Sequence, residues 1–423
     1  MKVIGSKKDL RKHIETVHDI QNGTGKTTIS STDTEACRHT DSDNIDSECE
    51  DPIVVDYTLE EQFRSEFSED EYSEGVTAKE QDLELPMEND DIYKEVHMVV
   101  RKTRESLSQN KNILHPMRYG VVDLTGRHAP SQSILTPWYE WLQTDFYKQI
   151  MYRRHKISEK EIQMILGLEE DATTEEEKLL KALSGICNFY GKRMLREASE
   201  HTHILYRLAH FVTFAEMEGP QWLAQWGEIT LNASSERRNK TCDPEARARI
   251  GQRCDYLLTY VGHAMCPEVL IGEVSGGIPA GANWKTWYDF LIKLVLGSRD
   301  CILRVMDKCE EQGKTIVMYS FQVTGFRLTV YAVGYFHGMW RVMMLDECLL
   351  PSSNEDKESR VEAYCILKGV MEAARSEANA IRRMLNSKAI SMESKERSSR
   401  KRENDDSIFV VDSPKKKIET FSP

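Results

Sequence analysis

The sequence has no two cysteines in C-x-x-C spacing, although ten cysteines are scattered along its 423 residues. A zinc ribbon or a disulfide framework needs regularly spaced cysteines, so neither is expected and the thiols should be reduced. No apolar run reaches the roughly 20 residues that a membrane-spanning helix needs. The first residues also lack the apolar core of a signal peptide. These absences favour a protein of the cytosol or nucleus with no membrane partner.

Acidic side chains are concentrated in one segment of the chain. Residues 32–95 hold 23 Asp and Glu against 4 Lys and Arg, a local charge of −19. The whole chain carries −13, so the remaining residues carry +6. A net-positive remainder is compatible with a partner that bears phosphates, such as nucleic acid.

Composition divides the chain into five parts. The acidic segment is rich in Ser and Thr and poor in aliphatic clusters, so it cannot bury enough apolar surface to offset its ordering entropy. Disorder is therefore predicted there, and also in the polar C-terminal tail. The predicted parts are a zinc-finger-like helix (1–18), an acidic disordered leader (19–91), a helical cover (92–198), a main domain (199–385) and a basic disordered tail (386–423).

The hydrophobic period changes near Trp226 from helical spacing to alternation. Helices are predicted at about 137–157, from Ser158 with a capping box to Glu161, and over 174–197, 199–216, 283–311 and 356–384. Strands are predicted over 226–233, 253–260, 268–275, 314–323, 327–336 and 339–345, and residues 120–125 form either a strand or an extended peptide. This order predicts an α/β domain of mixed α+β layering.

A hairpin with two facing carboxylates is the most informative local feature. Two β-prone runs, 253–260 and 268–275, flank a turn centred near Ala264, and this register sets Asp255 opposite Glu273. Two carboxylates on adjacent strands can hold a hard cation such as Mg²⁺ or Mn²⁺. The alternative is an ordinary hairpin with one buried and one solvated face.

The order of a helix, three strands with an Asp on the second and Glu-x-Ser on the third, and another helix resembles the PD-(D/E)XK nuclease-like superfamily. More narrowly, it resembles the uncharacterised sets of such proteins in early-diverging fungi. The matching stretches cover about residues 200–350 and are Trp226-Gly-Glu-Ile, Glu236-Arg-Arg-Asn239, Arg253-Cys-Asp255, Gly272-Glu-Val-Ser-Gly276, Asp289-x-x-x-Lys293 and Phe321-Gln-Val-Thr-Gly325. The resemblance implies a restriction-endonuclease-like αβββαβ core.

The resemblance also implies roles for site residues. Asp255 and Glu273 would ligate Mg²⁺ or Mn²⁺, while the position of the lysine that orients the attacking water is occupied by Ser275. A hydroxyl cannot supply that positive charge. Lys293, which shares a helical face with Asp289 and Lys285, is the candidate replacement, as in some members of the superfamily. The alternative is a solvated stripe of i,i+4 ion pairs.

A basic segment precedes the hairpin and is predicted as an inter-strand loop that holds phosphates. Its basic residues are Arg237, Arg238, Lys240, Arg247, Arg249 and Arg253. A charged, solvated surface loop is the alternative interpretation. Glu228 is either a third metal ligand or an ordinary strand-end carboxylate.

The C-terminal tail carries two kinds of short motif. Its apolar run resembles a SUMO-interacting motif, which would add a strand to a partner's sheet, and Ile53-Val-Val-Asp56 is a weaker copy. The run consists of Ile408, Phe409, Val410 and Val411. Two basic clusters flank it and predict nuclear import and a nuclear location. These clusters are Arg400, Lys401 and Arg402, and then Lys415, Lys416 and Lys417.

The N-terminus carries an incomplete metal-binding pattern. His13 and His18 resemble the helical half of a Cys₂His₂ finger. Tetrahedral zinc needs a preceding cysteine pair, which is missing here, so no zinc site is expected.

Three functions remain open from the sequence. The first is a Mg²⁺-dependent nuclease acting on nuclear DNA, with a mobile-element origin as one possibility. The second is a catalytically inactive nuclease-like module that binds nucleic acid or protein, which the serine at position 275 favours. The third is an unrelated α/β scaffold in which the carboxylates are incidental.

Overall fold

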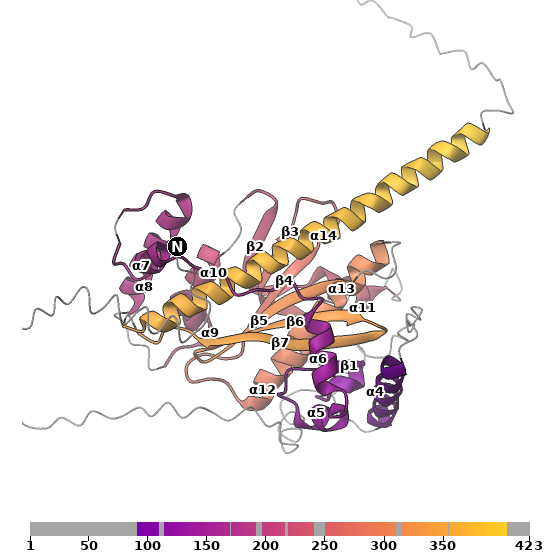
Figure 1. Ribbon diagram of the computed structural model, residues 1–423, viewed down its shortest axis with the longest axis horizontal. Helices are drawn as coiled ribbons and strands as arrows, with labels where there is room; N and C mark the ends of the chain where they lie inside the picture. Colours follow the sequence, from indigo (N-terminus) through magenta and orange to yellow (C-terminus); the bar gives the residue numbers. More distant parts are fainter. Residues whose placement is uncertain are drawn as a thin grey trace, which may run out of the picture.

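A seven-stranded mixed sheet forms the centre of the protein (Figure 1). The computed structural model describes residues 91–109, 114–169, 171–191, 197–215, 219–240, 250–309, 315–353 and 355–403. The strands are β1 (Val121–Asp123), β2 (Trp222–Thr230), β3 (Arg253–Tyr260), β4 (Glu268–Val274), β5 (Val317–Thr324), β6 (Arg327–Phe336) and β7 (Met339–Leu349). Their order across the sheet is β1-β7-β6-β5-β4-β3-β2.

Helices precede, interrupt and follow the strands. Before β2 the chain forms α4 (Asp91–Gln109), η1 (Pro116–Tyr119), α5 (Ala129–Leu135), α6 (Tyr139–Tyr147), α7 (Glu159–Ile165), α8 (Glu175–Gly191), α9 (Glu200–His203), the π-helical η2 (Ile204–Leu208) and α10 (Ala209–Ala215). After β2 it forms α11 (Asn232–Asn239), α12 (Asn283–Tyr288), the π-helical η3 (Asp289–Val295), α13 (Leu296–Lys308) and α14 (Lys357–Glu403). The capping box predicted between Ser158 and Glu161 is present at the start of α7.

The pairing of the strands confirms the mixed α/β class. β2, β3 and β4 form an antiparallel meander, and β5, β6 and β7 form a second one. β4 and β5 are parallel, so the chain must cross over between them, and it does so through α12, η3 and α13. The predicted long helix over 283–311 is this crossover.

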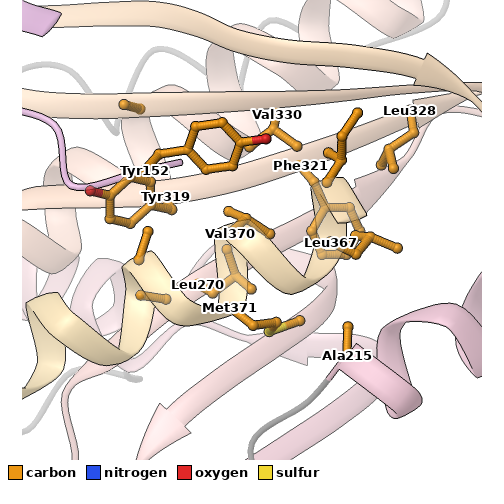
Figure 2. Close-up of a cluster of buried hydrophobic side chains, with 14 of the residues drawn as sticks. Tyr152, Ala215, Leu270, Tyr319, Phe321, Leu328, Val330, Leu367, Val370 and Met371 are labelled. Atoms are coloured by element: carbon orange, nitrogen blue, oxygen red, sulfur yellow. The ribbon is translucent and has the colours of Figure 1, made fainter. Parts of the chain in front are cut away.

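One face of the sheet packs against α14. Figure 2 shows Leu367, Val370 and Met371 of this helix pointing toward the strands, where Phe321 and Val330 belong to the same buried cluster. Burial of such apolar surface contributes about 25 cal/mol per Å² and is the main favourable term for this layer. The helix thus holds the four central strands together from one side.

The opposite face packs against the crossover helices. Leu257 of β3 and Ile271 of β4 share a buried cluster with Trp287, Leu291 and Ile302 of α12, η3 and α13. Neighbouring residues of the same strands face α14, as the period of two requires. The crossover helices therefore lie directly over the face on which the predicted carboxylates should project.

The N-terminal helices are not a separate layer, because they share the core of the sheet. Val122 of β1, Leu142 and Phe146 of α6, and Ile162 of α7 belong to the cluster that α14 fills. β1 itself pairs in parallel with β7 at one edge of the sheet. The segment 120–125, for which the sequence left two choices, thus includes a short strand.

The predicted helix over 137–157 is wrong in its second half. Only α6 is helical, and the chain from 150 to 158 is irregular. Arg154 lies between β7 and α14, where its Nε donates to Asp346 Oδ2 at 2.8 Å and its Nη1 to Glu362 Oε1 at 2.9 Å. These long-range contacts override the local helical pattern, which carries no information about them.

The predicted strand over 226–233 and the loop after it are also corrected. The strand begins earlier, at Trp222, and ends at Thr230, after which α11 begins. The carboxylate of Glu268, on β4, accepts the backbone N–H groups of Asn232 (2.6 Å) and Ala233 (3.1 Å). A helix N-terminus capped by a residue 35 positions away cannot be read from local sequence.

The tail predicted to be disordered from residue 386 is helical up to Glu403, because α14 continues that far. Figure 1 shows this helix crossing the sheet and then projecting beyond it. Extending an existing helix adds one hydrogen bond per residue without a new nucleus, which favours continuation. Residues 404–423 and residues 19–90 of the predicted leader (19–91) lie outside the described residues, while Asp91 is the first residue of α4.

Replacing Glu377 with glutamine is expected to change how stability depends on pH. This α14 side chain is 8% exposed and accepts the backbone N–H of Val317, and burial raises its pKa to about 7. Because the folded-state pKa lies above the usual value of 4.5, the carboxyl stabilises the fold at low pH and loses that contribution as the pH rises through 7.

Glutamine keeps the acceptor without the charge. Between pH 5 and pH 8, the wild type should therefore lose about 3 kcal/mol more unfolding free energy than Glu377→Gln does. Urea unfolding at several pH values measures the difference, and parallel pH profiles for the two proteins would contradict it.

Candidate active site at the ends of the central strands

The register of the β3–β4 hairpin is the one predicted from the sequence. Tyr256 pairs with Gly272, so the next step along the two strands sets Asp255 against Glu273. Both carboxylates are buried, at 5% and 0% exposure. Glu273 meets Lys293 of η3, which places the pair on the face covered by the crossover helices. The two carboxylates therefore share one face of the sheet.

Asp255 is held in place by the backbone of the neighbouring strand. Its Oδ2 accepts the N–H of Val274 at 2.8 Å. The next residue, Ser275, is followed by a sharp turn in which Gly276 adopts a φ of +88°, a conformation that favours glycine. The chain thus leaves the sheet immediately after the carboxylate pair, and β4 ends beside it.

Lys293 reaches the carboxylate pair from the crossover. Its Nζ contacts Glu273 Oε1 and lies 3.2 Å from Asp289 Oδ1. Asp289 is also 3.3 Å from the Nζ of Lys285, so the three residues share one helical face as predicted, and the contact of Lys293 with Glu273 shows that this face meets the strands. Asp289 and Lys293 lie in the π-helical segment, and single π turns inside α-helices are frequent at functional sites.

Glu200 is a site residue that the sequence reasoning missed. It lies in the first turn of α9, where its Oε2 accepts the N–H of Gly276 at 3.0 Å and lies 3.3 Å from Lys285 Nζ. The local signal was only an acidic residue after the N-cap Ser199, which is common at helix starts. Nothing in the spacing relates it to a turn 76 residues away.

Ser275 is buried and already engaged by Gln322 of β5. The Nε2 of Gln322 donates to Ser275 Oγ and to the backbone oxygen of Thr286, both at 2.8 Å. Its Oε1 accepts from the hydroxyl of Tyr331 at 3.3 Å. Gln322 therefore ties α12 to β4 and β5 and fixes the position of the crossover relative to the carboxylates.

Burial dominates the electrostatics of the pair. It raises the pKa of Asp255 to about 6, an effect that Glu200 and Glu228 increase and the N–H of Val274 opposes. Burial and then the charge of Asp255 raise the pKa of Glu273 well above its ordinary value. Burial works against the charge of Lys293, but the Glu273 and Asp289 carboxylates outweigh it and raise that pKa.

The charges of the site favour a divalent cation. The site contains four carboxylates and two ammonium groups, so it carries two net negative charges when all are ionised. The carboxylates are Asp255, Glu273, Asp289 and Glu200, and the ammonium groups are Lys285 and Lys293. Glu273 Oε2 is buried and accepts no hydrogen bond, and such an atom is costly unless a cation satisfies it. Within the described ranges, no three His, Cys, Asp or Glu side chains form a group that could hold a metal. Magnesium is nevertheless commonly held by one or two carboxylates, with waters and substrate phosphates completing its shell.

The basic residues predicted to bind phosphate are mostly engaged elsewhere. Arg237 and Arg238 lie in α11 and not in a loop, which corrects the prediction. Arg237 Nε is 2.7 Å from Asp300 Oδ1, and Lys240 Nζ is 2.9 Å from Asp307 Oδ2. Arg247 and Arg249 lie outside the described residues.

Arg253 is the basic residue of that set nearest to the site in sequence, two positions before Asp255. It is 52% exposed, and its Nη1 lies 3.8 Å from Glu228 Oε2. Glu228 is itself 60% exposed, as expected of a strand-end carboxylate. This exposed position does not favour Glu228 as a third metal ligand.

The motifs near the two ends of the sequence fall either in α14 or outside the described residues. Arg400, Lys401 and Arg402 fall in the last turn of α14, so this basic cluster is helical and not part of an irregular tail as predicted. The second basic cluster, Lys415, Lys416 and Lys417, lies outside the described residues. The same holds for the zinc-finger-like histidines and for the SUMO-interaction-like residues Ile408, Phe409, Val410 and Val411.

Comparisons with protein-family models, curated proteins and solved structures find no match to this chain. Among the described residues, no helix is long and apolar enough to cross a membrane.

Proposed function

We propose that this protein is a nuclease-like protein of the PD-(D/E)XK type that hydrolyses phosphodiester bonds of DNA with Mg²⁺ or Mn²⁺. The chain order supports this proposal: helices α9 and α10, the meander β2–β3–β4, the crossover helices, and then β5 parallel to β4. The observation that carries it is the buried pair Asp255 and Glu273, with the unsatisfied Glu273 Oε2 and the ammonium of Lys293 beside it.

Each residue of the pair has a defined role in this proposal. Asp255 and Glu273 would hold the cation, which when bound polarises the scissile phosphate and lowers the pKa of a water molecule. Lys293 keeps its proton and places a positive charge near the phosphate, where negative charge develops during attack. Ser275 cannot supply that charge, so Lys293, delivered from η3, takes the place of the missing strand lysine.

Cleavage assays with the full chain test the proposal. Single- and double-stranded DNA and RNA are incubated with the wild type and Mn²⁺ or Mg²⁺, with EDTA as the metal-free control. The control variant is Asp307→Asn. It removes a carboxylate of α13 that contacts Lys240 and leaves Asp255 and Glu273 intact. Metal-dependent DNA cleavage by both proteins supports the proposal, and the absence of cleavage of every substrate refutes it.

A catalytically inactive module that binds nucleic acid or protein is the second candidate. The observation in its favour is that the motif position holds Ser275, whose hydroxyl accepts from Gln322. In addition, the ammonium of Lys293 already partly neutralises Glu273. Nucleic-acid binding by the wild type without cleavage under any metal condition would select this interpretation.

We also propose a nuclear location, based on the two basic clusters of the tail. Alanine replacement of Lys415, Lys416 and Lys417 together with Arg400, Lys401 and Arg402 should shift a fluorescent fusion from the nucleus toward the cytoplasm. Import signals are recognised through their positive charge, which these replacements remove. Imaging of the wild-type and substituted fusions measures the ratio of nuclear to cytoplasmic signal. An unchanged nuclear signal would contradict the proposal.

A further inference from the structure

A row of polar side chains continues from the carboxylate pair across the sheet. Glu273 pairs with Gln322 of β5, Gln322 with Thr329 of β6, and Thr329 with Glu347 of β7. Paired residues of adjacent strands project from the same face, so this row and Asp255 belong to one surface of the sheet. The row runs along the end of the sheet at which β4 and β5 finish.

Two guanidinium groups converge on the far end of this row. Arg127 Nη2 lies 2.7 Å from Glu347 Oε2 and 3.0 Å from the hydroxyl of Thr329. Arg327 Nη1 lies 3.2 Å from Glu347 Oε1. The side chains of Arg127, Arg327 and Glu347 are 14%, 36% and 33% exposed, so solvent reaches all three. The charges of these three side chains sum to +1, and the buried carboxyl of Asp123, whose pKa burial raises to about 6, also interacts with Arg127.

We propose that Arg127, Arg327 and Thr329 form a second subsite, which binds a backbone phosphate of the nucleic-acid strand cleaved at the carboxylate pair. This inference rests on the proposed function. Strand spacing puts the subsite about 10 to 14 Å from Glu273, or about three to four nucleotides at 3.4 Å each. Guanidinium groups match the geometry of a phosphate, and the Thr329 hydroxyl, which donates to Glu347 Oε2 at 3.1 Å, can donate to a phosphate oxygen in its place.

The opposite face of the sheet shows why the charge count favours an anion. Asp346, the neighbour of Glu347 in β7, projects to that face and pairs with Arg154. Arg154 also binds Glu362, so one arginine meets two carboxylates and no positive charge is left over. That arrangement holds the segment around Arg154 against β7 and α14. Arg127 and Arg327, in contrast, are two arginines that share one carboxylate, Glu347. This carboxylate occupies the position that a phosphate would take.

Binding of labelled oligonucleotides in EDTA, where no cleavage occurs, tests the subsite. Fluorescence anisotropy compares the wild type, the double variant Arg127→Met with Arg327→Met, and the control Arg154→Met. The double variant should weaken binding by roughly tenfold and reduce the slope of log K against log salt by about 1. Arg154→Met should change neither value. Equal affinity and slope in the double variant and the wild type would overturn the proposal.

Glu347→Gln provides an independent measurement if the double variant does not fold. Removing the internal carboxylate charge frees both arginines, so binding should tighten severalfold and the salt slope should increase. Unchanged or weaker binding contradicts the subsite.

The outcomes also separate the subsite from the nuclease proposal. If the wild type binds as described but never cleaves, the nuclease proposal fails and the subsite stands. If the wild type cleaves DNA and the double variant retains its KM, the subsite fails alone. Parallel use of DNA and RNA oligonucleotides identifies which nucleic acid carries the bound phosphate.

Discussion

Asparagine in place of Asp255 is expected to abolish Mn²⁺ binding and DNA cleavage while making the metal-free protein more stable at pH 8. Burial raises the pKa of Asp255 to about 6, so its carboxyl stabilises the fold at low pH and loses that contribution as the pH rises through 6. At pH 8 the ionised side chain is also close to Glu273, and the neutral amide should recover about 2 to 3 kcal/mol.

Thermal unfolding with and without metal measures this effect. In the wild type, Mn²⁺ should raise Tm, because a ligand that binds only the folded state stabilises it. In Asp255→Asn the metal-free Tm should be higher than in the wild type and should not respond to Mn²⁺. Asp307→Asn, an exposed carboxylate variant, serves as the control and should behave as the wild type does. A lower metal-free Tm in Asp255→Asn would mean that this carboxylate stabilises the fold.

Methionine in place of Lys293 should reduce the cleavage rate by a factor on the order of 10² to 10³ while Mn²⁺ binding persists. Loss of one preorganised group that stabilises transition-state charge has an effect of this size. The ammonium contacts Glu273 Oε1, so removing it also removes a competitor for the cation. Metal affinity should therefore be equal to or higher than that of the wild type.

A matched lysine elsewhere controls for the loss of an ion pair. Lys160 of α7 lies 2.8 Å from Glu177 of α8. Lys160→Met should leave cleavage unchanged. Single-turnover rates separate the chemical step from substrate binding. A Lys293→Met variant that cleaves at the wild-type rate would show that the lysine acts only through its ion pair. Loss of Mn²⁺ binding would instead assign it a structural role.

The part of the site built from local pattern was predictable from the sequence. Alternation of β-prone residues around a turn gave the register that sets Asp255 against Glu273, because each strand has a period of two and the hairpin turn fixes the pairing. The spacing of Asp289 and Lys293 gave their common face in the same way. These relations depend only on residues close in the chain.

The remaining site residues depend on contacts between distant segments. Glu200 meets Gly276, 76 positions away, and Gln322 reaches Ser275 across the parallel pair β4–β5. Arg127 joins the sheet only because β1 pairs with β7. None of these contacts leaves a pattern in the residues next to it in the chain. They could therefore not be predicted from the local sequence. The same reason accounts for α11, a helix that the sequence did not predict and that Glu268 caps from β4.

The central claim is that Asp255 and Glu273 together hold a divalent cation, and anomalous diffraction from crystals soaked in Mn²⁺ tests it most directly. One anomalous peak is expected between the two carboxylates, bonded to the Glu273 Oε2 that accepts no hydrogen bond without metal. The peak should be absent from crystals of Asp255→Asn treated in the same way. A wild-type crystal with no peak at this position, and with Lys293 still in contact with Glu273, would contradict the account.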